Sequence, residues 1–278
     1  MGGAAAAMIG QRILVLIPHP DDEAVGCTAA IGKARQQGAR VFGALLTNGV
    51  PAPEMLWPWQ RKSHIQRVRR RRLEARRAAD VLGLEIESSQ EIPTRTLKSA
   101  LGGTHDLIQR LIRHLKIDML WTPAYEGGHQ DHDVTNFLAS TFRSTLPVWE
   151  FSEYNSADGR ARSQEFFSPN GNEKTIVLTH EEQRRKRAIL SLYLSERANL
   201  SHIWTEKEVF RPLAEYDYAK PPHSGKLFYQ RFQWVPFHPR VDMVKPEAVC
   251  RAIQEFRVVQ ESKPASRPAK AGVESVDD

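Results

Sequence analysis

Short apolar runs alternate with amphipathic segments along the first half of the chain. The apolar runs predict strands at 12–17, 40–49, 85–92, 118–123 and 147–154. Apolar residues recur at helical spacing between these runs, over about 23–37, 65–84, 105–116 and from 131 onwards. Strands that are apolar throughout and alternate with helices are typical of a parallel sheet that is buried on both faces. The pattern therefore predicts the α/β class, with a mostly parallel sheet and helices on both faces.

The pattern becomes less regular beyond about residue 155. It predicts a strand over 175–178 and a helix over about 180–194, followed by a stretch to Pro246 that is rich in proline and aromatic residues. No internal repeat or clear linker divides the chain. We therefore expect a single domain with a smaller C-terminal extension.

The expected domain spans 12–260, with a core of about 12–155 and a C-terminal part of about 156–260. We expect residues 1–11 to form a flexible N-terminus. The tail 261–278 is rich in proline, alanine, serine and charge and has no apolar periodicity, so we expect it to be disordered.

Histidine and aspartate cluster directly after two of the apolar runs. The first cluster, HPDDE, begins at His19, and the second, HQDHD, begins at His129. Ligands bind beyond the carboxyl ends of the strands in such sheets, so we expect both clusters to meet at one rim. Acids at the start of a helix often act only as caps. For the first cluster taken alone, a capping role and a functional role are equally good explanations. Two such clusters at two strand ends are hard to explain as caps.

One imidazole and one carboxylate from the first cluster, with one imidazole from the second, make three nitrogen and oxygen ligands. Such a set leaves a fourth position for water and is typical of a catalytic zinc site. Zinc lowers the pKa of bound water from about 15.7 to about 7, and a nearby carboxylate can then accept the proton. The residues alone do not decide whether Asp21 or Asp22 binds the metal. Fe²⁺ and Co²⁺ are alternative ions for such ligands.

The two clusters resemble the motifs of the PIG-L/LmbE family of zinc-dependent de-N-acetylases. The family pattern has HPDDE after an apolar strand and HxDH about a hundred residues later. Further matches are TNG at 47–49, Arg71 to Glu74 followed by AADVLG, and KRAILSLYLSE at 186–196. The resemblance covers about 12–210 and implies a Rossmann-like, LmbE-like fold.

The resemblance implies a role for each residue of the first cluster. His19 and Asp22 would hold zinc together with His132. Asp21 would be the general base that activates water and the general acid that later protonates the departing amine. His129 and Asp131, which lie in the second cluster, are the other two expected catalytic residues.

The resemblance also implies roles around the metal. His129 would stabilise the oxyanion, and Asp131 would orient this histidine and keep it charged. Arg71 is expected to contact substrate, although it lies among four consecutive arginines of which only one helix face can point inward. Asn48 is expected to line the pocket, and the backbone geometry of an Asn-Gly turn explains it nearly as well.

The function implied is a metal-dependent hydrolase that removes the acetyl group from an N-acetylated amino sugar or glycoconjugate, a small-molecule partner. An amidase acting on another N-acyl or thiol-conjugate substrate is the nearest alternative. The sequence departs from the family pattern at Ser195-Glu196, where relatives often have Ser-Gln, and at Gly127-Gly128, where some relatives have an aromatic residue. These departures leave the identity of the substrate open.

A net charge of +6 suggests attraction to anionic surfaces or substrates, and much of the excess lies in the segment 61–77. This segment raises the alternative of an RNA-binding or anionic-surface protein. It has no interleaved aromatic residues, so nucleic acid is the less favoured partner. Trp57 and Trp59 are expected near the mouth of the site, where they could stack on a sugar ring or pack against protein.

Two cysteines far apart, Cys27 and Cys250, do not form a disulfide framework, so a reducing compartment fits best. The chain has no apolar run long enough to cross a bilayer. We expect a cytoplasmic protein without a membrane span. A homo-oligomer is compatible with the sequence, which does not define the oligomeric state.

Overall fold

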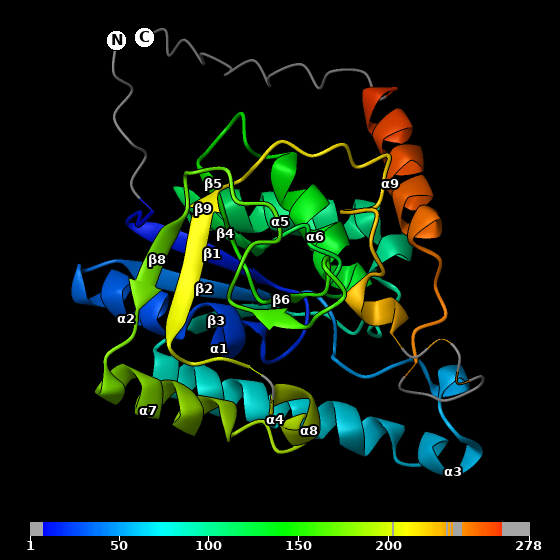
Figure 1. Cartoon of the computed structure of the whole chain (residues 1–278), viewed down its shortest axis with the longest axis horizontal. Coiled ribbons are helices and arrows are strands. Elements are labelled where there is room, and N and C mark those ends of the chain that lie inside the picture. The colour runs from blue at the N-terminus through cyan, green and yellow to red at the C-terminus, as the bar shows by residue number, and fades with distance from the viewer. Residues whose placement is uncertain (1–7, 202, 232, 234, 236–240, 263–278) are drawn as a thin grey trace, which may run out of the picture.

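The computed structural model describes residues 8–201, 203–231, 233, 235 and 241–262. Its centre is a seven-stranded sheet with the strand order β3-β2-β1-β4-β5-β9-β8 (Figure 1). The parallel strands are β1 (Arg12–Ile17), β2 (Arg40–Leu45), β3 (Glu85–Ser89), β4 (Met119–Pro123) and β5 (Val148–Phe151). Two antiparallel strands complete one edge, β9 (Lys207–Pro212) and β8 (Lys174–Val177). The predicted mostly parallel sheet is confirmed, and the C-terminal part of the chain adds strands to it.

Helices cover both faces of this sheet. One face packs against α1 (Asp22–Gly26), α2 (Thr28–Gln36), α4 (His64–Leu82) and α7 (His180–Leu190). The other face packs against α5 (Leu101–His114), α6 (Gln130–Ser140) and α9 (Pro246–Glu261). Alternate residues of each strand point to opposite faces. Ile13 and Val15 of β1 therefore join the first layer, whereas Leu14 and Leu16 join the second.

Shorter elements connect these layers. They are η1 (Pro53–Met55), α3 (Pro58–Arg61), η2 (Leu97–Ser99), α8 (Arg197–Leu200), η3 (Phe228–Gln230) and the two-stranded sheet of β6 (Tyr154–Asn155) and β7 (Arg162–Ser163). No helix in the described part of the chain is long and apolar enough to span a bilayer. Residues 1–7 and 263–278, where most of the flexible N-terminus and the disordered tail were expected, lie outside the described residues.

The single helix expected over 23–37 is wrong, because the chain breaks into α1 and α2 at Cys27. Gly26 lies against the ring of Phe151, where a Cβ atom would come within 2.3 Å of a ring carbon. After the break, the carboxylate of Glu208 on β9 accepts hydrogen bonds from the backbone N–H groups of Ala29 and Ala30, each at 3.0 Å. A buried acid from a distant strand thus caps a new helix start, and no local pattern announces it.

Among the longer elements, β9 and α9 were not expected. Helix α9 buries Val249, Cys250, Ile253 and Phe256 at helical spacing, so a periodic signal was present in its sequence. Helix α5 begins at Leu101 and includes Gly102 and Gly103 in its first turn. Glycine weakens a helix interior, which is why the sequence pattern placed this helix start later.

Candidate active site and metal centre

The predicted rim forms where three neighbouring parallel strands end. β1 leads into the segment from His19 to Asp22, β4 leads into the loop that carries His129, and β2 leads into Thr47 and Asn48. The Thr47 hydroxyl donates to the carbonyl of Pro18 at 2.7 Å, which joins the first and second strand ends. The sheet order therefore brings together stretches that are up to about a hundred residues apart in sequence.

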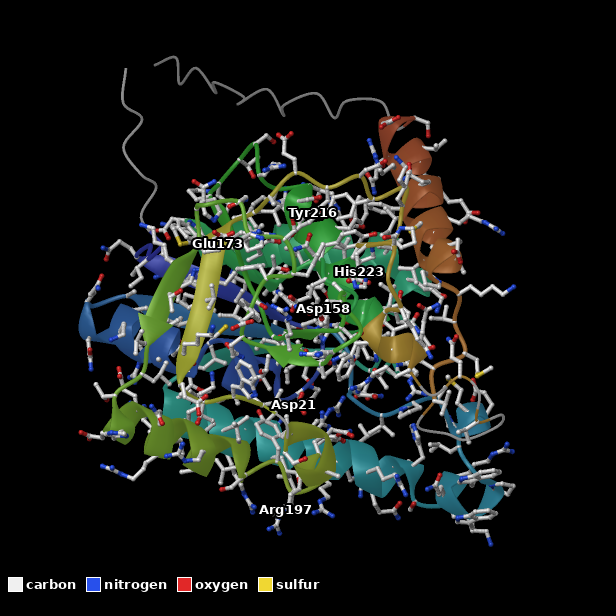
Figure 2. The ribbon with its side chains drawn as sticks, in the orientation of Figure 1. Asp21, Asp158, Glu173, Arg197, Tyr216 and His223 are labelled. Carbon is white, nitrogen blue, oxygen red and sulfur yellow. The ribbon has the colours of Figure 1, made fainter. Side chains whose placement is uncertain are left out.

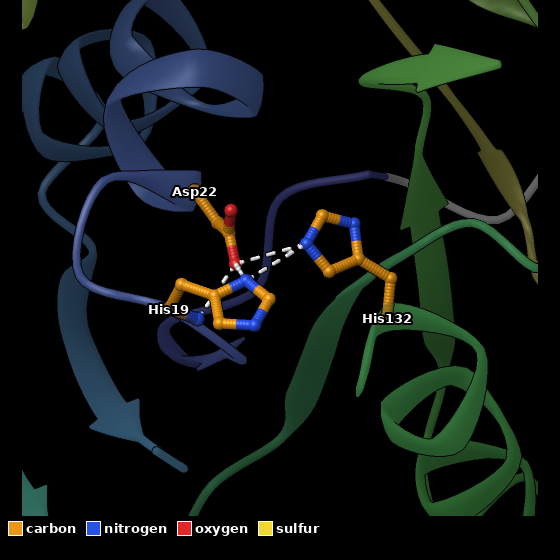
Figure 3. Close-up of side chains that lie close together, drawn as sticks. All are labelled: His19, Asp22 and His132. Atoms are coloured by element: carbon orange, nitrogen blue, oxygen red, sulfur yellow. Dashed lines mark hydrogen bonds and ion pairs between the residues drawn. The ribbon is translucent and has the colours of Figure 1, made fainter. Parts of the chain in front are cut away.

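Three side chains point at one another across this rim, as Figure 3 shows. His19 Nδ1 lies 3.1 Å from His132 Nε2. Asp22 Oδ2 lies 3.3 Å from each of these two nitrogens. Ligands about 2.0–2.1 Å from a tetrahedral zinc ion are about 3.3–3.4 Å from each other. The three atoms thus have the separations and the chemistry that fit a zinc site, and all three residues are buried.

Charge around these atoms favours a cation. Burial alone would lower the pKa of His19, but the carboxylates of Asp22 and Asp131 raise it to about 10. Burial would likewise raise the pKa of Asp22, but His132 and His19 hold it well below its ordinary range. The arrangement stabilises positive charge between the imidazoles and the carboxylate, which is the charge that a divalent ion supplies.

Asp131 supports the metal centre through His19. Its Oδ2 lies 3.0 Å from His19 Nε2 and accepts hydrogen bonds from the Thr94 hydroxyl at 3.0 Å and the Arg95 backbone N–H at 2.6 Å. With Nε2 donating to the carboxylate, the lone pair of His19 Nδ1 faces the other candidate ligands. This carboxylate–histidine arrangement is common behind metal-binding histidines.

Asp21 stands beside the candidate ligands in a strained conformation. Its φ of 140° is unusual for a residue other than glycine and is of the kind found at functional sites. Arg71 of α4 approaches its carboxylate, with Nη2 3.3 Å from Oδ2, and Figure 2 shows Asp21 between the sheet and α4. Burial raises the pKa of Asp21 well above its ordinary value, although Arg71 opposes the shift. The group is suited to accept and return a proton.

His129 caps α6 and offers a donor to the site. Its Nδ1 accepts the backbone N–H of Asp131 at 3.0 Å, so the neutral ring carries its proton on Nε2. Burial and the neighbouring His19 lower the pKa of His129 well below its ordinary value. The Asp131 carboxylate lies 3.7 Å from His129 Nδ1, farther than from His19. This arrangement favours a neutral His129 and differs from the expectation that Asp131 keeps it charged.

The two expected substrate residues are both buried. Among the four consecutive arginines, Arg71 is the one that points inward, where its guanidinium lies 3.4 Å from Ser195 Oγ and 3.7 Å from Glu196 Oε1. Asn48 donates to the Glu91 carbonyl at 3.1 Å and accepts from the Val50 N–H at 2.9 Å. The structure therefore brings Arg71 to Asp21, whereas Asn48 holds the turn after β2.

Comparison with known proteins agrees with this geometry. Residues 14–142 match the family model described as PIG-L: GlcNAc-PI de-N-acetylase. The chain carries a PIG-L domain. This match confirms the family resemblance and the enzyme class expected from the sequence, an N-deacetylase hydrolase. No curated protein matches the chain.

Several solved structures have the same fold as this chain with its PIG-L domain. The zinc-inhibited form of teicoplanin deacetylase Orf2 is 20% identical, with a TM-score of 0.57 over 74% of this chain and 99% of that one. The N,N'-diacetylchitobiose deacetylase from Pyrococcus horikoshii is 17% identical, with a TM-score of 0.52 over 76% of this chain and 84% of that one. GalB, the 4-carboxy-2-hydroxymuconate hydratase from Pseudomonas putida, is 14% identical, with a TM-score of 0.50 over 74% of this chain and 98% of that one. At these identities the likeness shows the fold alone.

The sequence analysis did not identify three buried acids that lie close to the candidate site, Glu23, Glu126 and Glu153. Glu23 accepts a hydrogen bond from the Tyr193 hydroxyl, and burial raises its pKa to about 7. Glu153 places Oε2 4.0 Å from His132 Nδ1. Glu126 accepts the backbone N–H of Glu153 at 2.8 Å and so fixes the segment after β5. Glu23 ends the HPDDE motif and Glu126 lies three residues before the second cluster, which is a usable signal, whereas Glu153 lies near the end of the predicted strand 147–154 and outside both clusters.

The tryptophans of the PIG-L domain stack on each other. The rings of Trp57 and Trp59 are 5.2 Å apart at an angle of 7°, and Trp59 remains 70% exposed. Trp59 lies in α3, at the N-terminal end of α4. The expected contact of these rings with a sugar stays a prediction.

Proposed function

We propose that the protein removes the N-acetyl group from an N-acetylated amino sugar or glycoconjugate in a reaction that needs a divalent metal ion, with zinc as the first choice. The observation that carries the proposal is the triangle of His19 Nδ1, Asp22 Oδ2 and His132 Nε2, with Asp21 beside it. The PIG-L family match supports acetamide hydrolysis as its chemistry.

The candidate metal ligands and Asp21 have separate roles in the proposed reaction. A zinc ion held by His19, Asp22 and His132 would lower the pKa of a water and polarise the acetyl carbonyl. Asp21 takes the proton of the attacking water on its carboxylate and delivers it to the leaving nitrogen, so that the amide and water become a free amine and acetate. Burial of Asp21 suits this role, because it raises the pKa of the carboxyl toward the working pH.

His129 and Arg71 support the reaction but do not transfer the proton that Asp21 moves from water to the leaving nitrogen. The Nε2–H of His129 donates to the oxygen that becomes negative when water attacks the carbonyl. Arg71 holds the Asp21 carboxylate in place and limits the rise of its pKa. Asp131 fixes the ring of His19 in the orientation that metal binding requires.

An amidase that acts on another N-acyl substrate is the second candidate within the same chemistry. The residues around the metal centre act on the amide bond alone and do not select the group that carries the nitrogen. The presence of a hydratase among proteins of this fold shows that the fold by itself does not choose a reaction. Cytoplasmic location is part of the proposal, and it is supported by Cys27 and Cys250, which are both free and buried.

The direct test is release of primary amine from a panel of N-acetylated amino sugars by the zinc-loaded protein. We expect release that stops after chelation and returns when metal is added back. Asp106→Asn, an exposed change on α5, is the control and should behave like the wild type. Release of amine only from N-acyl compounds other than sugars would favour the amidase, and no release by the metal-loaded protein would contradict the proposal.

A further inference from the structure

Helix α4 has an outer face that the active site does not use. Its inner face is buried and carries Arg71 toward Asp21. On the opposite side, residues at helical spacing are exposed, and we call them the α4 outer face: Ile65, Arg69, Leu73, Arg76 and Arg77. In Figure 1, α4 runs along the lower border of the molecule and α3 lies beyond its end. The face therefore looks away from the sheet.

Positive charge on this face is not balanced locally. The segment 61–77 contains nine lysine and arginine residues and one acid, Glu74. Glu74 is buried, where it binds Ser195 and Arg70. Arg69 and Arg77 make no ion pair within the described residues. The exposed acid Asp80 lies on the same side of the helix, three residues after Arg77 and four after Arg76, and makes no ion pair within the described residues, so the face keeps a large net positive charge.

Large apolar side chains are exposed among these cations. Ile65 is 63% exposed and Leu73 is 53% exposed, both on the α4 outer face. Trp59 of α3, the short helix that precedes the N-terminal end of α4, is 70% exposed. Basic residues interleaved with exposed aliphatic and tryptophan side chains are typical of helices that lie in a membrane interface. A nucleic-acid surface would use the cations but has no use for exposed isoleucine and leucine.

We propose that the α4 outer face, together with Trp59, docks on a membrane surface that contains anionic phospholipids. The cations would contact lipid headgroups, while Trp59, Ile65 and Leu73 enter the boundary between headgroups and acyl chains. A helix of 19 residues is about 28 Å long, which is enough to lay several charges along the surface. The protein would lie on the bilayer, in keeping with the finding that no described helix can cross it. This proposal does not depend on deacetylase activity.

Co-sedimentation with lipid vesicles tests the proposal. We expect the full chain to bind vesicles of phosphatidylcholine that also contain phosphatidylglycerol. It should not bind vesicles made of pure phosphatidylcholine, and its binding should weaken as the salt concentration rises. Arg69→Gln combined with Arg77→Gln should lower the partition coefficient about 30-fold, since each cation near such a surface contributes about a factor of five. Trp59→Ala should remove the binding that persists at high salt.

The matched control is Arg110→Gln combined with Arg113→Gln, which removes the same charge from the exposed surface of α5 on the other side of the sheet. This control should bind as the wild type does. Asp21→Asn should also bind normally, which separates docking from the proposed function. Equal binding to neutral vesicles, no binding to either vesicle, or an equal loss in the control would overturn the proposal. Tighter binding to single-stranded RNA with the same dependence on Arg69 and Arg77 would assign the face to nucleic acid instead.

Discussion

At the scale of single residues, Asp21 is the group on which the proposed chemistry depends. It adopts a φ of 140°, lies buried next to the candidate ligand Asp22, and receives the guanidinium of Arg71. Burial raises its pKa well above the ordinary carboxyl value, and Arg71 lowers it again in part. The balance between the two sets the pH at which Asp21 can accept a proton.

This balance predicts the pH dependence of the reaction. Asp21 must be ionised to act as a base, so kcat/KM should fall as the pH decreases through its raised pKa. Arg71→Met removes the cation that lowers this pKa, and the acid limb should move upward by about one pH unit or more. Arg69→Met, on the exposed side of the same helix, is the control. An acid limb that stays in place in Arg71→Met would show that another group is the base.

A second residue-scale prediction concerns His129. Its Nε2–H is available because Nδ1 accepts the N–H of Asp131. His129→Ala should lower kcat by about 100- to 1000-fold, the usual effect of losing one oxyanion donor, while the bound metal is retained. Kinetics beside metal analysis of the purified variant would measure both. Loss of metal in this variant would instead make His129 a ligand.

At the scale of elements, the break between α1 and α2 ends the short helix that carries Asp22. The break is held by Glu208, which caps α2 and pairs with Lys186 Nζ at 2.8 Å, with both side chains fully buried. Lys186 belongs to α7, so three elements meet at one ion pair. The junction between α1 and α2 therefore depends on residues that lie far along the chain.

We expect Lys186→Met to destabilise the fold by about 3–5 kcal/mol, because it leaves the Glu208 carboxylate buried without its partner. Lys186→Met combined with Glu208→Gln should recover much of this loss. Urea unfolding followed by circular dichroism measures the difference. Lys220→Met, at an exposed position, is the control. A single variant as stable as the wild type would show that this buried pair does not hold the break.

At the scale of the whole molecule, the sequence was sufficient for the parallel core and for the residues of the rim. Apolar runs define β1, β2 and β4, and the ends of such strands must share an edge of the sheet. It was insufficient where contacts are distant: the break at Cys27 depends on Glu208, and the pairing of Asp131 with His19 depends on the order β1-β4. Local periodicity contains no information on such contacts.

The candidate metal centre also joins two layers of the fold. His19 and Asp22 follow β1 at the start of α1, and His132 belongs to α6 in the opposite helix layer. An ion that binds only the folded protein stabilises it, by about 2.7 kcal/mol at a free concentration of 100 times its Kd. We expect chelation to lower Tm and zinc to restore it. A Tm indifferent to metal in the wild type, or equally responsive in His132→Ala, would contradict this assignment.

The most direct test of the central claim compares Asp21→Asn with Asp22→Asn for bound metal and for turnover of an N-acetylated substrate. In each variant an amide nitrogen replaces one carboxylate oxygen, but only Asp22 belongs to the triangle with His19 and His132. We predict that Asp21→Asn keeps stoichiometric metal and loses most turnover, while Asp22→Asn loses metal and turnover together. Metal loss in Asp21→Asn, with turnover intact in Asp22→Asn, would contradict the account.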